Sequence, residues 1–202
     1  MKMPISEKLA KLNLISGDKV CKIFDKNYSD ILSKDYASES AFVKELWERY
    51  SPEGQNLNGK VFEGILATLF YRSAILPLYV QAEMTFVPNV EFDFVAYTQE
   101  RGPIILSAKT SLRERYKQAD LEGMMLRQVH RKALSYLITL DETEALGCNK
   151  KIEAGKILGL DKVIVATSKD FDSLITQLKS FNYIKPNKID VITSMRLIQG
   201  GL

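Results

Sequence analysis

The sequence predicts an α/β protein in which a mixed β-sheet of about five strands is flanked by helices, with a helical region ahead of the sheet. Apolar residues recur at helical spacing over residues 5–50 and again over 59–73. Two segments then alternate with a period of two, and apolar strands alternate with amphipathic stretches afterwards. A hairpin followed by a crossover helix and a parallel strand is typical of a mixed sheet covered by helices. We expect an N-terminal helical region, 1–58, packed on a core of residues 59–202.

The helices are predicted from apolar spacing and capping residues. Leu9, Leu12 and Ile15 follow a helical period in a first segment, and the period resumes from Val20 to Ile31. Ser38 is a candidate N-cap for a helix that continues to Tyr50. Residues 59–73 are apolar nearly all round, which indicates a buried helix.

The strands follow this buried helix. Residues 80–87 and 90–97 alternate with period two, and residues 104–110 begin with an apolar run typical of a central strand. A long amphipathic helix is then predicted over 116–140, because Leu121, Met125 and Val129 repeat at helical spacing. Residues 141–156 read as a loop or short helix, 162–167 as a fourth strand, 170–181 as a helix, and 188–193 as a fifth strand.

Composition excludes several classes of protein. The chain has one histidine, His130, which sits inside the predicted 116–140 helix, so nucleases built on histidine pairs and zinc fingers are excluded. Cys21 and Cys148 form no metal-ligand motif and no disulfide framework. The N-terminal segment lacks the pattern of a signal peptide, and no apolar run reaches the roughly 20 residues of a membrane helix. We therefore expect a cytoplasmic protein that does not bind membranes.

Residues from three segments of the chain could form one reactive site: Glu63 in the buried helix, Asp93 in one strand, and Ser107-Ala108-Lys109 at the end of the next strand. A carboxylate binds a hard cation, and a neighbouring lysine ammonium can hold a water or a phosphate oxygen. Burying Glu63 without a partner is unfavourable, so it either borders such a site or pairs at the surface with Arg72 or Lys60. An Asp and a Ser-x-Lys also occur by chance at strand ends.

The order helix-Glu, strand-Asp, strand-x-Lys resembles the PD-(D/E)xK nuclease superfamily, and within it the type II restriction endonucleases. The resemblance covers about residues 59–193 and implies a restriction-endonuclease-like αβββαβ core. It implies catalysis by Glu63, Asp93, Ser107 and Lys109, and a Mg²⁺ ion held by Asp93, the backbone carbonyl of Ala108, Glu63 and Ser107. In this resemblance Lys109 orients the attacking water. Ser107 departs from the family, which usually has an acid there, and Phe92 stands where the motif name has proline.

A basic stretch follows the Lys. Net charge is only +3, but residues 107–132 hold seven basic and three acidic residues. Taken alone, such a stretch is more typical of a solvated helix face, whereas beside a candidate metal site it indicates a polyanionic ligand. The segment from Lys109 to Arg115 also resembles restriction endonucleases. Thr110 and Ser111 can cap the next helix, whose N-terminus then favours phosphate. The residues expected at DNA are Thr110, Ser111, Arg113, Arg115, Lys117, Arg127 and Arg131. Arg113 and Arg115 could instead form ion pairs with Asp120 or Glu122.

The sequence therefore predicts a Mg²⁺-dependent type II restriction endonuclease that cuts double-stranded DNA at a short palindrome as a homodimer. Trp47 and Tyr50 in the N-terminal region are candidates for an exposed face at the dimer or the DNA, or else belong to the core. Two alternatives stay open. One is a structure-selective nuclease of junction-resolvase or repair type, and the other is an inactive nuclease-fold protein that binds DNA.

Overall fold

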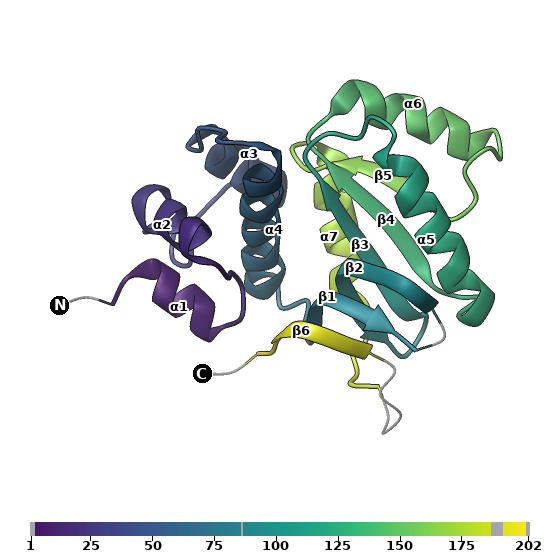
Figure 1. Ribbon diagram of the computed structural model, residues 1–202, viewed down its shortest axis with the longest axis horizontal. Coiled ribbons are helices and arrows are strands. Elements are labelled where there is room, and N and C mark those ends of the chain that lie inside the picture. Colours follow the sequence, from purple (N-terminus) through teal and green to yellow (C-terminus); the bar gives the residue numbers. More distant parts are fainter. Residues whose placement is uncertain (1–2, 86, 187–191, 201–202) are drawn as a thin grey trace.

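The computed structural model of the chain describes residues 3–85, 87–186 and 192–200, and these residues fold around a single mixed sheet (Figure 1). Within these residues the strand order is β5-β4-β3-β2-β1-β6. The pairs β1–β2, β2–β3 and β1–β6 are antiparallel, and β3–β4 and β4–β5 are parallel. The strands are β1 (Leu78–Met84), β2 (Val87–Thr98), β3 (Gly102–Lys109), β4 (Leu134–Thr139), β5 (Lys162–Val165) and β6 (Ile192–Ile198).

Helices cover both faces of this sheet. Helices α5 (Arg115–Val129) and α6 (Glu142–Glu153) pack on one face, and α4 (Gln55–Arg72) and α7 (Lys169–Lys179) pack on the other. The predicted mixed sheet flanked by helices is therefore confirmed. The αβββαβ order is also present, from α4 through β4, but its last strand is β4 and not the strand predicted over 162–167, which is β5. The sheet has one strand more than the expected five.

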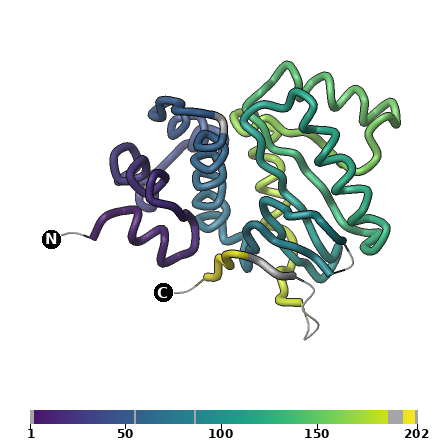
Figure 2. Tube along the Cα trace, in the orientation of Figure 1, coloured from purple at the N-terminus to yellow at the C-terminus, as the bar shows by residue number. Residues whose placement is uncertain are grey.

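The N-terminal helices lie on the far side of α4 from the sheet (Figure 2). They are α1 (Ile5–Lys11), α2 (Asp18–Asn27) and α3 (Glu39–Glu48). Ser38 caps α3 as predicted, since its side chain accepts the Ala41 N–H. Buried residues of these helices, of α4, of α7 and of the sheet form one continuous apolar cluster. Tyr50 is buried, and Trp47 is partly buried against Phe62, so neither forms the exposed face considered above.

The long helix predicted over residues 116–140 is wrong in its second half. Helix α5 ends at Val129 with His130 as its C-cap, and β4 begins at Leu134. The segment Leu134–Thr139 is almost wholly buried between β3 and β5. Leu137 follows the helical spacing of the apolar residues in α5 only by coincidence. Its segment forms a strand because it pairs with β3 and β5 in the sheet, and this tertiary environment outweighs the local pattern. His130 accordingly lies at a helix end rather than inside a helix.

The remaining boundaries differ by a few residues. Helix α1 stops at Lys11, short of Ile15, and residues 141–156 contain a full helix, α6, capped by Asp141. Most of the strand predicted over 188–193 lies outside the described residues, and β6 is described from Ile192 onward. None of the helices in the described part of the chain is long and apolar enough to cross a membrane.

Candidate active site

Asp93 and Lys109 meet on neighbouring strands. Lys109 Nζ lies 2.7 Å from Asp93 Oδ2, and both side chains are mostly buried, with 22% and 17% of their surface exposed. Strand alternation explains the meeting, since Asp93 in β2 and Lys109 in β3 both project toward the face covered by α5. The sequence placed these two residues in one site, and the structure brings them into direct contact.

The contact forms where β2 and β3 separate. The ladder between the strands runs from Thr98 and Gly102 to Phe94 and Leu106 and goes no further. Beyond it, Asp93 Oδ2 accepts the backbone N–H of Ala108 at 2.7 Å. The Asp93 carboxylate thus replaces a backbone carbonyl of the ladder as the acceptor for the Ala108 N–H. This hydrogen bond satisfies a buried donor and fixes the carboxylate beside Lys109.

Glu63 approaches the pair from α4. Burial raises the pKa of Glu63 to about 7, the Asp93 carboxylate contributes to the rise, and Lys109 and Arg196 oppose it. A cavity of about 140 Å³ opens beside Glu63, lined also by Lys60, Gln81 and Arg196. Glu63 therefore borders the Asp93–Lys109 pair, and Arg72 is not its partner, because Arg72 donates to the carbonyl oxygens at positions 31 and 34.

Glu122 is a fourth charged group at this position, and the sequence did not identify it as a site residue. It lies on α5, its Oε1 accepts from Gln118 Nε2 at 2.7 Å, and it is close enough to Lys109 and Asp93 to interact with both charges. Burial is the main cause of the raised pKa of this carboxyl, and Asp93 adds to it. Two carboxyls with raised pKa values, Glu63 and Glu122, thus flank Asp93 from helices on the two faces of the sheet.

Two glycines set the position of Glu122. A Cβ atom on Gly123 would lie 2.3 Å from the Gly159 carbonyl oxygen, and one on Gly159 would lie 1.9 Å from the Asp120 carbonyl oxygen. Asp120 also accepts the N–H groups of Leu158 and Gly159. Helix α5 therefore packs directly on the backbone of the loop before β5, and this close approach holds Glu122 against the sheet.

Ser107 and Ala108 complete the predicted set. Ser107 is 3% exposed and lies on the same strand face as Lys109. The Ala108 side chain is buried in the opposite core, and its N–H is held by Asp93. Coordination by the Ser107 hydroxyl or the Ala108 carbonyl stays a prediction.

The expected capping of α5 by Thr110 or Ser111 is wrong. Helix α5 starts at Arg115, its N-cap is Glu114, and no side chain caps it. The intervening turn is held by α6, since Glu144 Oε2 accepts the N–H of Leu112 at 2.8 Å and that of Arg113 at 2.6 Å. The N-terminus of α5 therefore lies at Arg115 rather than directly after Ser111, and phosphate binding at this helix end stays a prediction.

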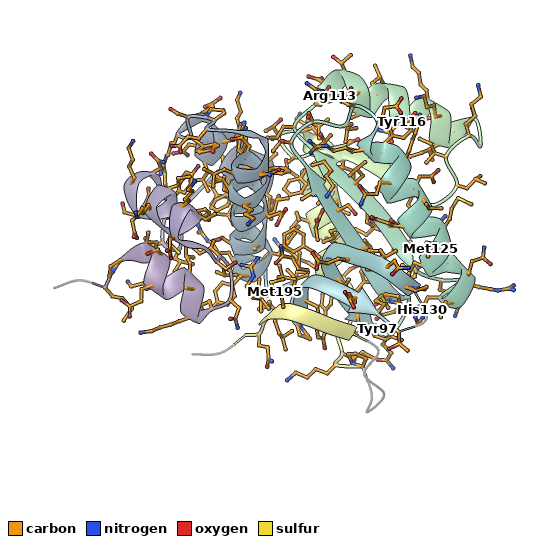
Figure 3. All side chains as sticks on the ribbon, in the orientation of Figure 1. Tyr97, Arg113, Tyr116, Met125, His130 and Met195 are labelled. Atoms are coloured by element: carbon orange, nitrogen blue, oxygen red, sulfur yellow. The ribbon has the colours of Figure 1, made fainter. Side chains whose placement is uncertain are left out.

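The basic residues do not form one patch. Figure 3 places Arg113 at one end of α5 and His130 at the other, with Arg131 following His130 in the chain. Arg127 bridges to Asp161 at 2.6 Å and donates to the Leu158 carbonyl oxygen, so it has a structural role in the loop before β5. Asp120 and Glu122 have other partners and leave the alternative pairing with Arg113 unsupported. Arg115 precedes Lys117 in the first turn, and Lys117 pairs with Glu114 at the surface.

The donor set fits a hard divalent cation bound partly through water. No three acidic, histidine or cysteine side chains gather as a closed metal cluster in the described residues. Magnesium does not require one, because it is commonly held by one or two carboxylates and keeps several waters. A cation beside Asp93 would favour the charged forms of Glu63 and Glu122, which burial and the Asp93 charge now disfavour.

Comparison with solved structures identifies the fold. The chain aligns with the restriction endonuclease PspGI, solved in complex with substrate DNA, at a TM-score of 0.55 and 19% identity, covering 92% of this chain and 84% of that one. The chain has the fold of a restriction endonuclease. Ecl18kI, solved metal-depleted with uncleaved, modified DNA, aligns at a TM-score of 0.38 and 21% identity over 68% of this chain and 48% of its own, which is too little overlap to support a conclusion. No protein-family model and no curated protein matches the chain.

Proposed function

We propose that this protein is a Mg²⁺-dependent DNA endonuclease of the PD-(D/E)xK superfamily. We further propose that it acts as a type II restriction enzyme, a homodimer in the cytoplasm that cuts both strands of a short palindrome. The observation that carries the proposal is the Asp93–Lys109 pair at the point where β2 and β3 separate, flanked by Glu63 and Glu122. The fold shared with PspGI supports it, because that protein was solved on substrate DNA.

In this proposal the carboxylates would bind the cation and Lys109 would position the attacking water or a phosphate oxygen. Asp93 would be the main metal ligand, with Glu122 or Glu63 as the second carboxylate, and Mg²⁺ when bound relieves negative charge on the phosphate and acidifies water. Lys109 Nζ, held by Asp93, can donate a hydrogen bond to the attacking water or to a phosphate oxygen. Burial of these groups strengthens each of these interactions relative to water.

Digestion of unmethylated phage DNA tests the proposal. We expect discrete limit-digest bands with Mg²⁺, none with EDTA, and none from Asp93→Asn with Mg²⁺. The matched control is Asp170→Asn, which removes the same charge from an exposed ion pair between α7 and β5 and should cut like the wild type. Sequencing the ends would give the recognition site, and cross-linking would test the dimer.

The other outcomes point to the two alternatives. Cleavage of branched DNA without bands from linear DNA would identify a structure-selective nuclease. Binding without cleavage under all metal conditions would identify a DNA-binding protein and overturn the proposed activity. Equal cleavage by the wild type and Asp93→Asn would remove Asp93 from the site.

A further inference from the structure

A second feature of the molecule lies beside the candidate site, where α2 and α4 begin. An open cavity of about 1050 Å³ separates the first turns of these helices. Its lining includes four lysines, Lys19, Lys22, Lys26 and Lys60, against two acids, Asp18 and Glu53. The cavity wall is therefore net positive, although the chain as a whole carries only +3.

Three of the lysines form one row. Lys19, Lys22 and Lys26 are spaced three and four residues apart on α2, so they share a helix face. Like charges at this spacing weaken a helix slightly, by a few tenths of a kcal/mol per pair. Within the described part of the chain no hydrogen bond or ion pair engages their ammonium groups, whereas Lys34, Lys162 and others elsewhere are paired with carboxylates. The row thus presents uncompensated charge to the cavity.

Both helices also start at this cavity without side-chain caps. The N-caps are Gly17 for α2 and Gly54 for α4, and neither glycine has a side-chain oxygen that could accept a first-turn N–H group. The first-turn N–H groups of a helix lack intrahelical partners and favour an anion. Side chains cap α3 and α6, through Ser38 and Asp141, whereas α1, α5 and α7 also begin without a side-chain cap. The feature particular to the cavity is therefore that two uncapped helix N-termini meet the lysines there.

The lysine-lined cavity continues to Glu63. Lys60, Ser16 and Val20 line both it and the smaller cavity of about 140 Å³ that contains Glu63 and Arg196. Nε and Nη1 of Arg196 are buried and have no hydrogen-bond partner among the described residues. Two buried guanidinium nitrogens without acceptors are unfavourable, and phosphate oxygens are acceptors of the right charge and geometry. Arg196 lies on β6 next to Met195, which Figure 3 labels at the edge of the sheet.

We propose that the lysine row on α2, Lys60 and Arg196 form a continuous binding track for the phosphodiester backbone of the DNA strand that enters the candidate active site. The row from Lys19 to Lys26 extends roughly 10 Å along α2, which matches about three nucleotides at the rise of duplex DNA. Arg196 and Lys60 then receive the phosphate nearest Glu63. This inference rests on the proposed function and names residues outside the basic stretch of 107–132.

The salt dependence of DNA binding tests the track. We would measure the affinity of a short labelled duplex in EDTA, so that no strand is cut, for the wild type and for the triple variant Lys19→Gln, Lys22→Gln, Lys26→Gln. The control carries Lys150→Gln, Lys156→Gln and Lys169→Gln, three exposed lysines of α6, the turn after it and α7 that line neither cavity. Both variants lose the same net charge, so a difference between them reports position.

Each phosphate contact contributes about 0.9 to the slope of log affinity against log salt concentration. We expect the α2 variant to bind with a slope shallower by about 2 to 3, whereas the control keeps a slope close to that of the wild type. Between 50 and 200 mM salt this difference amounts to about 40-fold in affinity. Arg196→Gln should weaken binding about tenfold at low salt, and Arg196→Lys should recover part of the loss.

The outcomes separate this inference from the proposed function. A wild type that cuts DNA, together with an α2 variant that binds with the wild-type slope, would overturn the track and leave the nuclease in place. Equal losses in the α2 and control variants would also overturn it, since only net charge would then matter. A wild type that neither binds nor cuts DNA would overturn both proposals.

Discussion

The pKa of Glu63 leads to a prediction about stability. The value of about 7 in the folded protein compares with an ordinary value of 4.5, so between these two pH values the folded state binds a proton that the unfolded state has released. The free energy of unfolding should therefore fall as the pH rises from about 4.5 to about 7, and this contribution should stay constant above 7. The charged carboxylate is the unfavourable form, because it is buried near the Asp93 carboxylate.

The size of the effect follows from the shift. A displacement of roughly 2.5 pH units corresponds to a loss on the order of 3 kcal/mol at pH 8 relative to pH 4. Glutamine at this position has no charge to bury at any pH. Glu63→Gln should thus be similar to the wild type at pH 4.5 and more stable at pH 8 by an amount of this order.

Urea unfolding in EDTA between pH 4.5 and 8.5 measures this difference directly. Glu153→Gln, at an exposed position on α6, is the matched control, and its stability should stay parallel to that of the wild type across the range. Millimolar Mg²⁺ should stabilise the wild type at pH 8 more than it stabilises Glu63→Gln, if Glu63 contributes to binding the cation. Parallel pH curves for the wild type and Glu63→Gln would refute the assignment of a buried, destabilised carboxyl.

Two further predictions concern catalysis and packing. Asp93→Asn and Lys109→Met should each lower the rate of DNA cleavage by at least about 100-fold, measured by digestion, while circular dichroism shows that both variants still fold. Cleavage within a few-fold of the wild type by either variant would contradict the proposed roles. Gly123→Ala should destabilise the protein by about 1–3 kcal/mol in urea unfolding, because the new methyl group meets the Gly159 carbonyl oxygen. Gly147→Ala on α6, where a Cβ atom meets nothing within 4 Å, should be stabilising instead, and equal effects at the two sites would contradict the close approach.

The central part of the fold was predictable because pattern and environment agree there. The alternation in β2 places Asp93 opposite the apolar side chains Phe94 and Ala96, and the apolar run of β3 leads directly to Lys109. Local sequence was enough to put Asp93 and Lys109 on adjacent strands. It was also enough to identify Glu63 as a carboxylate inside an apolar helix.

Two features depended on distant contacts that periodicity does not reveal. Strand β4 was not predicted because Ala133 and Leu137 continue the apolar spacing of α5. The segment forms a strand because it pairs with β3 on one side and β5 on the other, which the local sequence does not show. Glu122 was missed because it sits in a charged helix where surface pairing is the ordinary interpretation. The neighbouring Gly123, an unfavourable residue inside a helix, was the available signal that this part of α5 packs closely on something.

The continuous core that joins the N-terminal helices to the sheet has a consequence for where a strand would be cut. Helix α4 packs on both α2, which carries the lysine row, and the sheet, whose strands β2 and β3 carry Asp93 and Lys109. The lysines and the reactive pair are therefore held by one continuous core. A backbone held by the lysines would therefore reach the reactive pair after a constant number of nucleotides. Cleavage would fall at one phosphodiester rather than being spread over several neighbouring ones, as it would be if α2 were attached through a flexible linker.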